Sequence, residues 1–216
     1  MAAASLQPSF FFYLSTMQEI WEKLLLTSWL EAIAMVSGLL FPIFASFEKK
    51  ICWLFGGISA LTYAWVMFDE QLYQDGVLSI FYIVMSIYGY LMWQGVIKPK
   101  KDPVKISHAS PFTVFIYITI SLQYFFIGGY CFDNFTDADY PYVDAFVTGF
   151  SLVATWLEAK KKIDNWYLFL VADSVGVWLF WQKGLILTSI LYIIYCIICV
   201  YGIIQWKKKI KLLKLQ

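Results

Sequence analysis

Seven apolar stretches, separated by short polar connections, make up most of the chain. Each approaches the length of about 20 residues that an α-helix needs to cross a bilayer. Their limits lie near 28–46, 51–68, 77–97, 111–131, 143–159, 166–182 and 185–206. The pattern predicts an all-α integral membrane protein with seven transmembrane helices.

The residues before the first span follow a different pattern. Between Phe10 and Leu26, polar side chains recur at steps of three and four residues, which gathers them on one face of a helix. We expect residues 1–27 to form an amphipathic segment that lies in the membrane interface. The first Lys is Lys23 and no small-residue cleavage site follows, so no signal peptide is predicted.

The Lys residues indicate an orientation. If the connections alternate between the two sides of the membrane, fourteen of the sixteen Lys residues share one side, and only Lys23 and Lys183 lie opposite. The Lys-poor side carries acidic residues in its connections: Asp69, Glu70, Asp75, Asp133, Asp137 and Asp139. By the positive-inside rule, the N-terminus is outside, and the basic tail at 207–216 is cytoplasmic.

The chain also matches itself when it is shifted by 113 residues, without a gap. The shift aligns Glu31-Ala32 with Asp144-Ala145, Lys49 with Lys162, Trp53 with Trp166, Trp65 with Trp178, Tyr82 with Tyr195, Tyr88-Gly89 with Tyr201-Gly202, and Trp93 with Trp206. Because Trp is rare, several aligned Trp residues indicate an internal repeat.

Each half of the repeat holds three spans, within residues 28–97 and 132–206. A cytoplasmic linker and one further span, at 98–131, separate them. Because three is an odd number, the halves face the same way only if a further span intervenes. We therefore predict two parallel three-helix repeats joined by a linking helix. This is a layout found in membrane transporters, which bind their substrate near the midplane where the repeats meet.

Composition excludes several other classes of protein. The chain is 61% hydrophobic and 14% charged, too apolar for a soluble domain of this size. All basic residues are Lys, which disfavours nucleic-acid binding. Cys196 and Cys199 lie in an apolar run without a His, so we expect no metal site and no cofactor. A membrane enzyme is one alternative, but the one His, His108, lies in the predicted linker, so no acid-base group for catalysis is evident. A receptor that only binds its ligand is a further alternative.

Several runs of residues fit one known family. They are Trp29-Leu-Glu-Ala32, Ala45-Ser-Phe-Glu-Lys-Lys50, Ile80-Phe-Tyr-Ile-Val-Met-Ser-Ile-Tyr-Gly89, Trp93, Lys160-Lys-Lys-Ile-Asp-Asn-Trp166, Leu191-Tyr192, Gly202 and Trp206. Together they resemble the PnuC family of bacterial vitamin transporters, whose best-known member takes up nicotinamide riboside. The resemblance covers about Trp29 to Trp206.

The resemblance implies a three-plus-one-plus-three fold similar to that of the SWEET sugar transporters. It further implies facilitated diffusion of a small-molecule vitamin across the bacterial inner membrane, and trapping of that vitamin by a cytoplasmic kinase. It also suggests a homotrimer. The sequence has no phosphate-binding loop of the G-x-x-x-x-G-K-[ST] type, so we expect no direct coupling to a nucleotide.

The family pattern at the start of the sixth span is Asn-Trp-x-x-Trp-x-x-x-Asn. Asn165 and Trp166 match it, while Phe169 and Asp173 replace the second Trp and the final Asn. Ser79 stands where a Gln is common in the third span. Nicotinamide riboside stays the first substrate hypothesis on family frequency alone, with thiamine and riboflavin as alternatives.

Trp166, Phe169 and Asp173 share one helical face, because they are spaced i, i+3 and i+7. Asp173 falls near the middle of its span, where a carboxylate costs about 2.5 to 3.5 kcal/mol, so we expect it to face the bundle interior or a wet cavity. A carboxylate beside aromatic rings suits a flat organic cation, and both nicotinamide riboside and thiamine are such cations. The alternative is that Asp173 only forms hydrogen bonds between helices.

Two polar stripes complete the candidate site. They are Asp75, Ser79 and Tyr82 on the third span, and Thr188, Tyr192 and Tyr195 on the seventh, each spaced i, i+4 and i+7. Their hydroxyl groups either line the path or join helices. Most of the Trp residues lie near span ends, where anchoring at the membrane interface is the default interpretation: Trp53, Trp65, Trp93, Trp178, Trp181 and Trp206.

Overall fold

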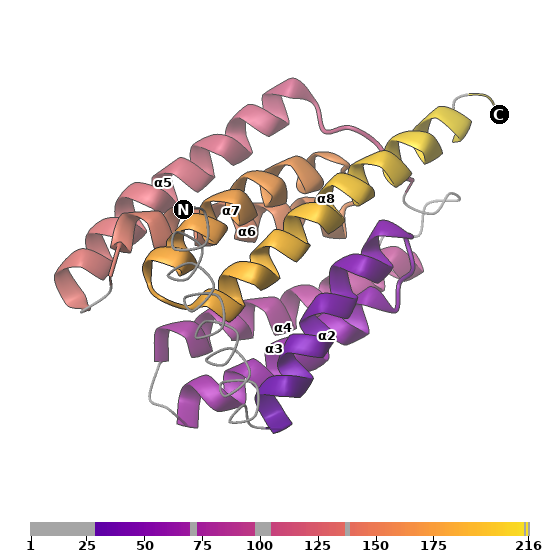
Figure 1. Ribbon diagram of the computed structural model, residues 1–216. Coiled ribbons are helices and arrows are strands. Elements are labelled where there is room, and N and C mark those ends of the chain that lie inside the picture. Colours follow the sequence, from indigo (N-terminus) through magenta and orange to yellow (C-terminus); the bar gives the residue numbers. More distant parts are fainter. Residues whose placement is uncertain (1–28, 70–72, 98–104, 137–138, 214, 216) are drawn as a thin grey trace, which may run out of the picture.

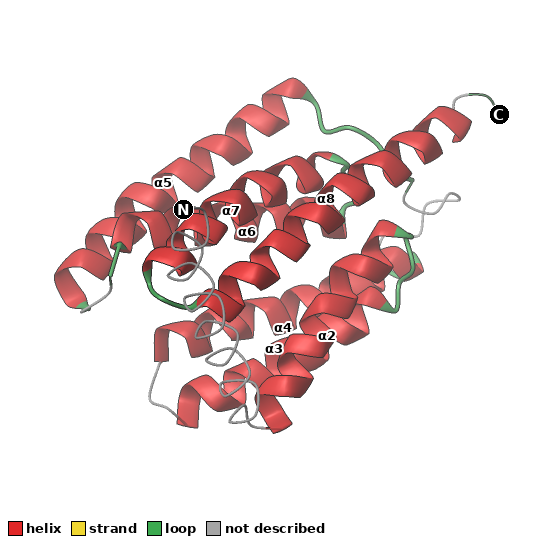
Figure 2. Ribbon diagram, viewed as in Figure 1, coloured by secondary structure: helices red, strands yellow, loops and turns green. Residues whose placement is uncertain are grey.

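The computed structural model describes residues 29–69, 73–97, 105–136, 139–213 and 215. Within these residues it contains the seven helices that the sequence predicts. They are α2 (Trp29–Ser46), α3 (Cys52–Asp69), α4 (Tyr73–Gln94), α5 (Pro111–Phe135), α6 (Pro141–Ala159), α7 (Asp164–Gln182) and α8 (Ile186–Leu213). The fully described connections, between α2 and α3, α6 and α7, and α7 and α8, are short (Figure 2). The amphipathic segment predicted for residues 1–27 lies outside the described residues.

α5 and α8 extend well past the C-terminal limits that hydropathy suggests. α5 continues past residue 131 to Phe135, because Asn134 Nδ2 donates to the Tyr130 carbonyl at 2.8 Å and Thr136 Oγ1 donates to the Phe132 carbonyl at 2.6 Å. These bonds satisfy carbonyl groups of the last turn. α8 continues through the Lys-rich stretch to Leu213, since Lys is a good helix former.

The helices form two bundles (Figure 1). In the first bundle, α2 packs against α3 and α3 against α4; in the second, α5 packs against α6, α6 against α7, and α7 against α8. The bundles meet through two helix pairs, α2 with α8 and α4 with α6. In Figure 1, α5 lies on the side of the second bundle that faces away from α2, α3 and α4.

The outer surface is apolar over large areas. On α5, Phe112, Phe115 and Phe126 expose 72%, 66% and 62% of their surface. Exposed apolar surface of this extent is rare on soluble monomers and suits contact with lipid. By length and composition, α5 and α8 are each apolar enough to cross a membrane.

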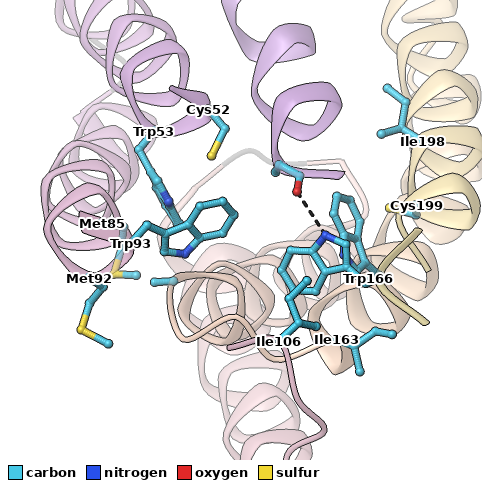
Figure 3. Packing of buried hydrophobic residues seen from close by; sticks show 13 residues of the cluster. Cys52, Trp53, Met85, Met92, Trp93, Ile106, Ile163, Trp166, Ile198 and Cys199 are labelled. Atoms are coloured by element: carbon cyan, nitrogen blue, oxygen red, sulfur yellow. Dashed lines mark hydrogen bonds between the residues drawn. The ribbon is translucent and has the colours of Figure 1, made fainter. Parts of the chain in front are cut away.

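Four Trp rings fill the core where the bundles meet. Figure 3 shows Trp53 and Trp93 of the first bundle near Trp166 of the second. The edge-to-face pair Trp53 and Trp93 has ring centroids 5.8 Å apart, and the corresponding pair Trp166 and Trp206 has centroids 5.7 Å apart. Trp53, Trp93 and Trp206 are thus buried core residues, and their interpretation as interface anchors is wrong. Trp65, with 69% of its surface exposed, still fits that interpretation.

The two bundles exchange hydrogen bonds through this core. Trp93 Nε1 donates to the Glu158 carbonyl at 3.2 Å, and Trp206 Nε1 donates to the Ala45 carbonyl at 3.2 Å, the dashed bond in Figure 3. Trp206 follows Trp93 by 113 residues, and Glu158 follows Ala45 by the same offset. We refer to these two reciprocal bonds as the tryptophan clasp.

The turns that precede α3 and α7 lie beside the clasp and also correspond. Glu48 and Lys161 both have positive φ angles, 57° and 51°. Lys161 Nζ binds Glu48 Oε1 at 2.6 Å, and Lys209 of α8 pairs with the other carboxylate oxygen. Burial raises the pKa of Glu48, but hydrogen bonds and charge from Lys161 and Lys209 outweigh burial and bring that pKa below its ordinary value.

The described end of the linker is fixed to the second bundle. Ser107 forms two backbone hydrogen bonds with the turn before α7, from its N–H to Lys161 at 3.2 Å and from Ile163 to its carbonyl at 3.1 Å. The Ala109 N–H donates to Asp164 Oδ2 at 2.6 Å. These bonds set the point from which α5 begins.

Gly89 provides a test of the packing under the clasp. The Trp53 ring lies directly on Gly89, so an added methyl group would overlap a ring that is 2% exposed. We expect Gly89→Ala to destabilise the protein by about 1–3 kcal/mol, as overpacking does, and to lower its melting temperature in detergent by several degrees.

Gly57→Ala is the matched control for Gly89→Ala. A methyl group at position 57 meets Ser86 Cβ at 3.5 Å, an ordinary contact. Because Ala favours helix over Gly, Gly57→Ala should leave the melting temperature unchanged or slightly higher. Equal melting temperatures for the two variants would contradict the described packing of Trp53.

Candidate functional site

A cavity of about 320 Å³ lies between the two bundles. Its lining comes from α2, α3 and α4 on one side and from α6, α7 and α8 on the other. No residue of α5, which the structure describes throughout, belongs to this lining. The volume falls within the range of small-molecule sites.

Asp173 brings a carboxyl group to the cavity from the middle of α7. Its surface is 6% exposed, and Cys199 Sγ of α8 donates to its Oδ2 at 3.5 Å. A thiol is a weak donor, and a carboxylate has about four acceptor sites. Most of the hydrogen-bonding capacity of Asp173 therefore remains for a ligand.

Trp166 and Phe169 line the cavity together with Asp173, so the three residues do share one face of α7. Trp166 is 1% exposed, because its ring lies against Gly202 and meets the edge of Trp206. Phe169 is less buried than Trp166. Of the two rings, Phe169 therefore offers the larger surface for stacking.

The polar stripes on α4 and α8 reach the cavity from opposite bundles. Ser79 and Tyr82 line it from α4, and Tyr192 and Tyr195 line it from α8. The rings of Tyr192 and Tyr195 have centroids 5.7 Å apart, and Tyr192 also lies against Gly176, which fixes its position. These four side chains surround the cavity with hydroxyl groups.

Two predicted site residues do not line the cavity. Asn165 is fully buried at the start of α7, where its Nδ2 donates to the Lys162 carbonyl at 2.6 Å. Thr188 lies in the first turn of α8 and is half-buried. The structure does not describe the side chain of Asp75. His108, in the linker, does not line the cavity either; its Nδ1 lies 3.7 Å from Asp164 Oδ1 at the start of α7.

Sequence reasoning missed the contribution of α6. Ser151, Thr155 and Glu158 line the cavity from this helix. Glu158 is completely buried, and neither of its carboxylate oxygens has a hydrogen-bond partner among the described residues. The internal repeat could have drawn attention to Glu158. The 113-residue shift aligns Glu158 with Ala45 and Asp173 with Ala60, so each carboxyl group stands where the first repeat has a small apolar residue.

The charged groups of the cavity have one sign. Asp173 and Glu158 are its acidic residues, and none of the described residues that line it is basic. Acidic groups beside aromatic rings attract cations both by charge and by the negative face of the ring. The cavity is therefore suited to a small cation with a flat, ring-containing body.

Known proteins resemble the chain along nearly its whole length. The nicotinamide riboside transporter PnuC of Escherichia coli (strain K12) is 26% identical over 203 residues, covering 83% of this chain and 85% of the relative. The transporter of the same name from Neisseria mucosa is 25% identical over 198 residues, covering 85% and 74%. A shorter match, 29% identical over 66 residues and 31% of each chain, is the riboflavin/roseoflavin transporter RibM of Streptomyces davaonensis.

The fold is also that of a solved structure, the crystal structure of the vitamin B3 transporter PnuC. The TM-score is 0.68 at 23% identity, over 95% of this chain and 92% of the other. The sequence pattern of the nicotinamide mononucleotide transporter family matches residues 28–208. The chain therefore belongs to the nicotinamide mononucleotide transporter family and is a membrane transporter rather than an enzyme.

Proposed function

We propose that the protein carries a vitamin, in the first place nicotinamide riboside, by facilitated diffusion through the cavity between its two bundles. The observation that carries this proposal is that the Asp173 carboxyl group and the Phe169 ring line one cavity inside an apolar bundle. Nicotinamide riboside has a flat pyridinium ring, which such a pair recognises by charge and by stacking. The names of the relatives from Escherichia coli and Neisseria mucosa support this substrate.

The proposed binding site assigns a role to each predicted residue. Asp173 faces the positive charge, and Phe169 and Trp166 form the aromatic wall. The hydroxyl groups around the cavity form hydrogen bonds with the ribose: Ser79, Tyr82, Tyr192 and Tyr195. Asn165 and Thr188 act from outside the lining, because they lie at the starts of α7 and α8 and help to position these helices.

We also infer that the bundles are two parallel repeats, with α5 as the linking helix. Three correspondences at the 113-residue offset support this arrangement. They are the reciprocal bonds of the tryptophan clasp, the positive φ angles of Glu48 and Lys161, and the Trp53 and Trp166 rings on Gly89 and Gly202. Glu48 and Lys161 are themselves 113 residues apart and in contact, as expected for residues on the axis that relates the repeats. Rocking of the repeats about the site would give alternating access.

Orientation, assembly and trapping belong to the same proposal. The Lys residues at the clasp end and the tail favour a cytoplasmic position for that end in the bacterial inner membrane, with the N-terminus outside. Phosphorylation of the vitamin by a cytoplasmic kinase would prevent its exit. The family resemblance favours a homotrimer.

Thiamine is the second candidate substrate, and a specific observation favours it. Asp173 and Phe169 stand where the nicotinamide riboside pattern has Asn and Trp. This departure from the pattern is what brings thiamine in as the alternative. Its thiazolium ring carries a full positive charge, as the pyridinium ring of nicotinamide riboside does, so the carboxyl group suits both substrates equally. Riboflavin is uncharged, so Asp173 gives no reason to prefer it, despite the partial match to RibM.

Asp173→Asn tests the recognition of charge. Loss of a charge-assisted interaction costs about 1.5–3 kcal/mol, so we expect the Kd for nicotinamide riboside or thiamine to rise about 10- to 100-fold. Isothermal titration calorimetry on the purified protein measures this change. Asp133→Asn is the control, because Asp133 is exposed on α5 and should leave the Kd unchanged. An unchanged Kd for Asp173→Asn would remove Asp173 from the binding site.

A second experiment separates a transporter from a receptor. Purified protein in liposomes should equilibrate labelled nicotinamide riboside or thiamine across the bilayer without a nucleotide or an imposed ion gradient. Protein-free liposomes give the background rate. Binding of the vitamin without flux above this background would contradict facilitated diffusion and favour a receptor.

A further inference from the structure

Glu158 is a second buried carboxyl group in the cavity, and the proposed binding site does not use it. It is the next-to-last residue of α6, its surface is 0% exposed, and it lines the cavity. Neither carboxylate oxygen has a hydrogen-bond partner among the described residues. A buried carboxyl group without a partner is costly, so a cation that reached it would be bound favourably.

The neighbouring Lys residues do not neutralise Glu158, because each of them has another partner. Lys160 Nζ lies 4.1 Å from the centre of the Trp156 ring. Lys161 Nζ binds Glu48 at 2.6 Å, and Lys162 Nζ donates to Ser107 Oγ at 2.8 Å. A structural ion pair therefore does not account for Glu158.

The fold does not require a carboxyl group at this position either. The corresponding residue of the first bundle is Ala45, which is also 0% exposed and whose carbonyl accepts the Trp206 bond of the clasp. The Glu158 carbonyl accepts the equivalent bond from Trp93. The clasp thus needs the backbone of residue 158, whereas the side chain is free to serve another purpose.

Glu158 and Asp173 lie at different depths of the same cavity. Glu158 is one residue from the clasp end of α6, and Asp173 is the tenth residue of α7, which starts at that end. At 1.5 Å per residue, the two backbones differ in depth by about 12 Å. Side chains tilt toward the N-terminus of their helix, so these two lean toward each other. Cys199 of α8 lines the same cavity and donates to Asp173 Oδ2.

We propose that Glu158 is a second cation-binding position on the transport path, which accepts the positive charge of the substrate as it leaves Asp173 toward the clasp end. This inference rests on the proposed function. Because both carboxyl groups line one cavity, the positive charge of the substrate can pass from Asp173 to Glu158 without losing an acidic partner inside the bundle. Asp173 then sets the equilibrium affinity, and Glu158 sets the rate of passage.

Glu158→Gln tests this proposal, because it removes the charge and keeps the shape of the side chain. We expect the Kd for nicotinamide riboside or thiamine to stay within about threefold of the wild-type value, while the maximal flux in liposomes falls at least about tenfold. Glu158→Asp should recover part of the flux. Asp144→Asn is the control on the same helix; Asp144 pairs with Lys183 outside the cavity and should leave both quantities unchanged.

The outcomes distinguish this inference from the proposed function. If the wild-type protein shows no vitamin flux in liposomes, the proposed function itself is contradicted, whatever the result for the Glu158 variants. Unchanged flux in Glu158→Gln overturns the proposed role of Glu158. An equal loss of affinity and flux also overturns it, because Glu158 would then belong to the same binding site as Asp173. A proton gradient could instead drive flux in the wild type but not in Glu158→Gln. That result would identify proton coupling and overturn the proposal that Glu158 binds the substrate cation. If Glu158→Gln does not fold, Glu158→Ala, which restores the residue of the first repeat, replaces it.

Discussion

A carboxyl group is costly inside a membrane-spanning bundle, because lipid and apolar side chains cannot solvate it. This protein holds two such groups, Asp173 and Glu158, in the cavity between its bundles. Hydroxyls, a thiol and aromatic rings also line this cavity, and no Lys does so in the part of the chain that the structure describes. A cation that binds between them would offset the free energy that burial of these carboxyl groups costs. The proposed selectivity of the cavity for a positively charged substrate follows from that constraint.

The contacts between the bundles explain how such a cavity stays open. Many of them lie at one end: the tryptophan clasp, the pairing of Glu48 with Lys161 and Lys209, and the stacked rings of Tyr88 and Trp156, whose centroids are 5.2 Å apart. The clasp bonds hold the backbones of Ala45 and Glu158 where the bundles meet. The proposed rocking of the repeats would separate these contacts when the site opens toward the clasp end.

Much of this organisation could be predicted from the sequence, because a bilayer imposes helix length and a repeat preserves rare residues. Seven helices and the common face of Trp166, Phe169 and Asp173 followed from spacing alone. Glu158 could not be recognised in the same way, since it adjoins three Lys residues and resembles a boundary charge. The burial of Trp53 and Trp206 also escaped prediction, because proximity to a span end does not reveal which face of a helix meets another bundle.

In the proposed function, the cavity recognises its substrate by the positive charge. Nicotinamide riboside and its reduced dihydropyridine form have nearly the same size and the same ribose, but only the oxidised form carries the ring charge. Calorimetry with both compounds on the wild-type protein therefore isolates the charge. We expect the oxidised form to bind at least about tenfold more tightly. Equal affinity for the two forms would contradict it.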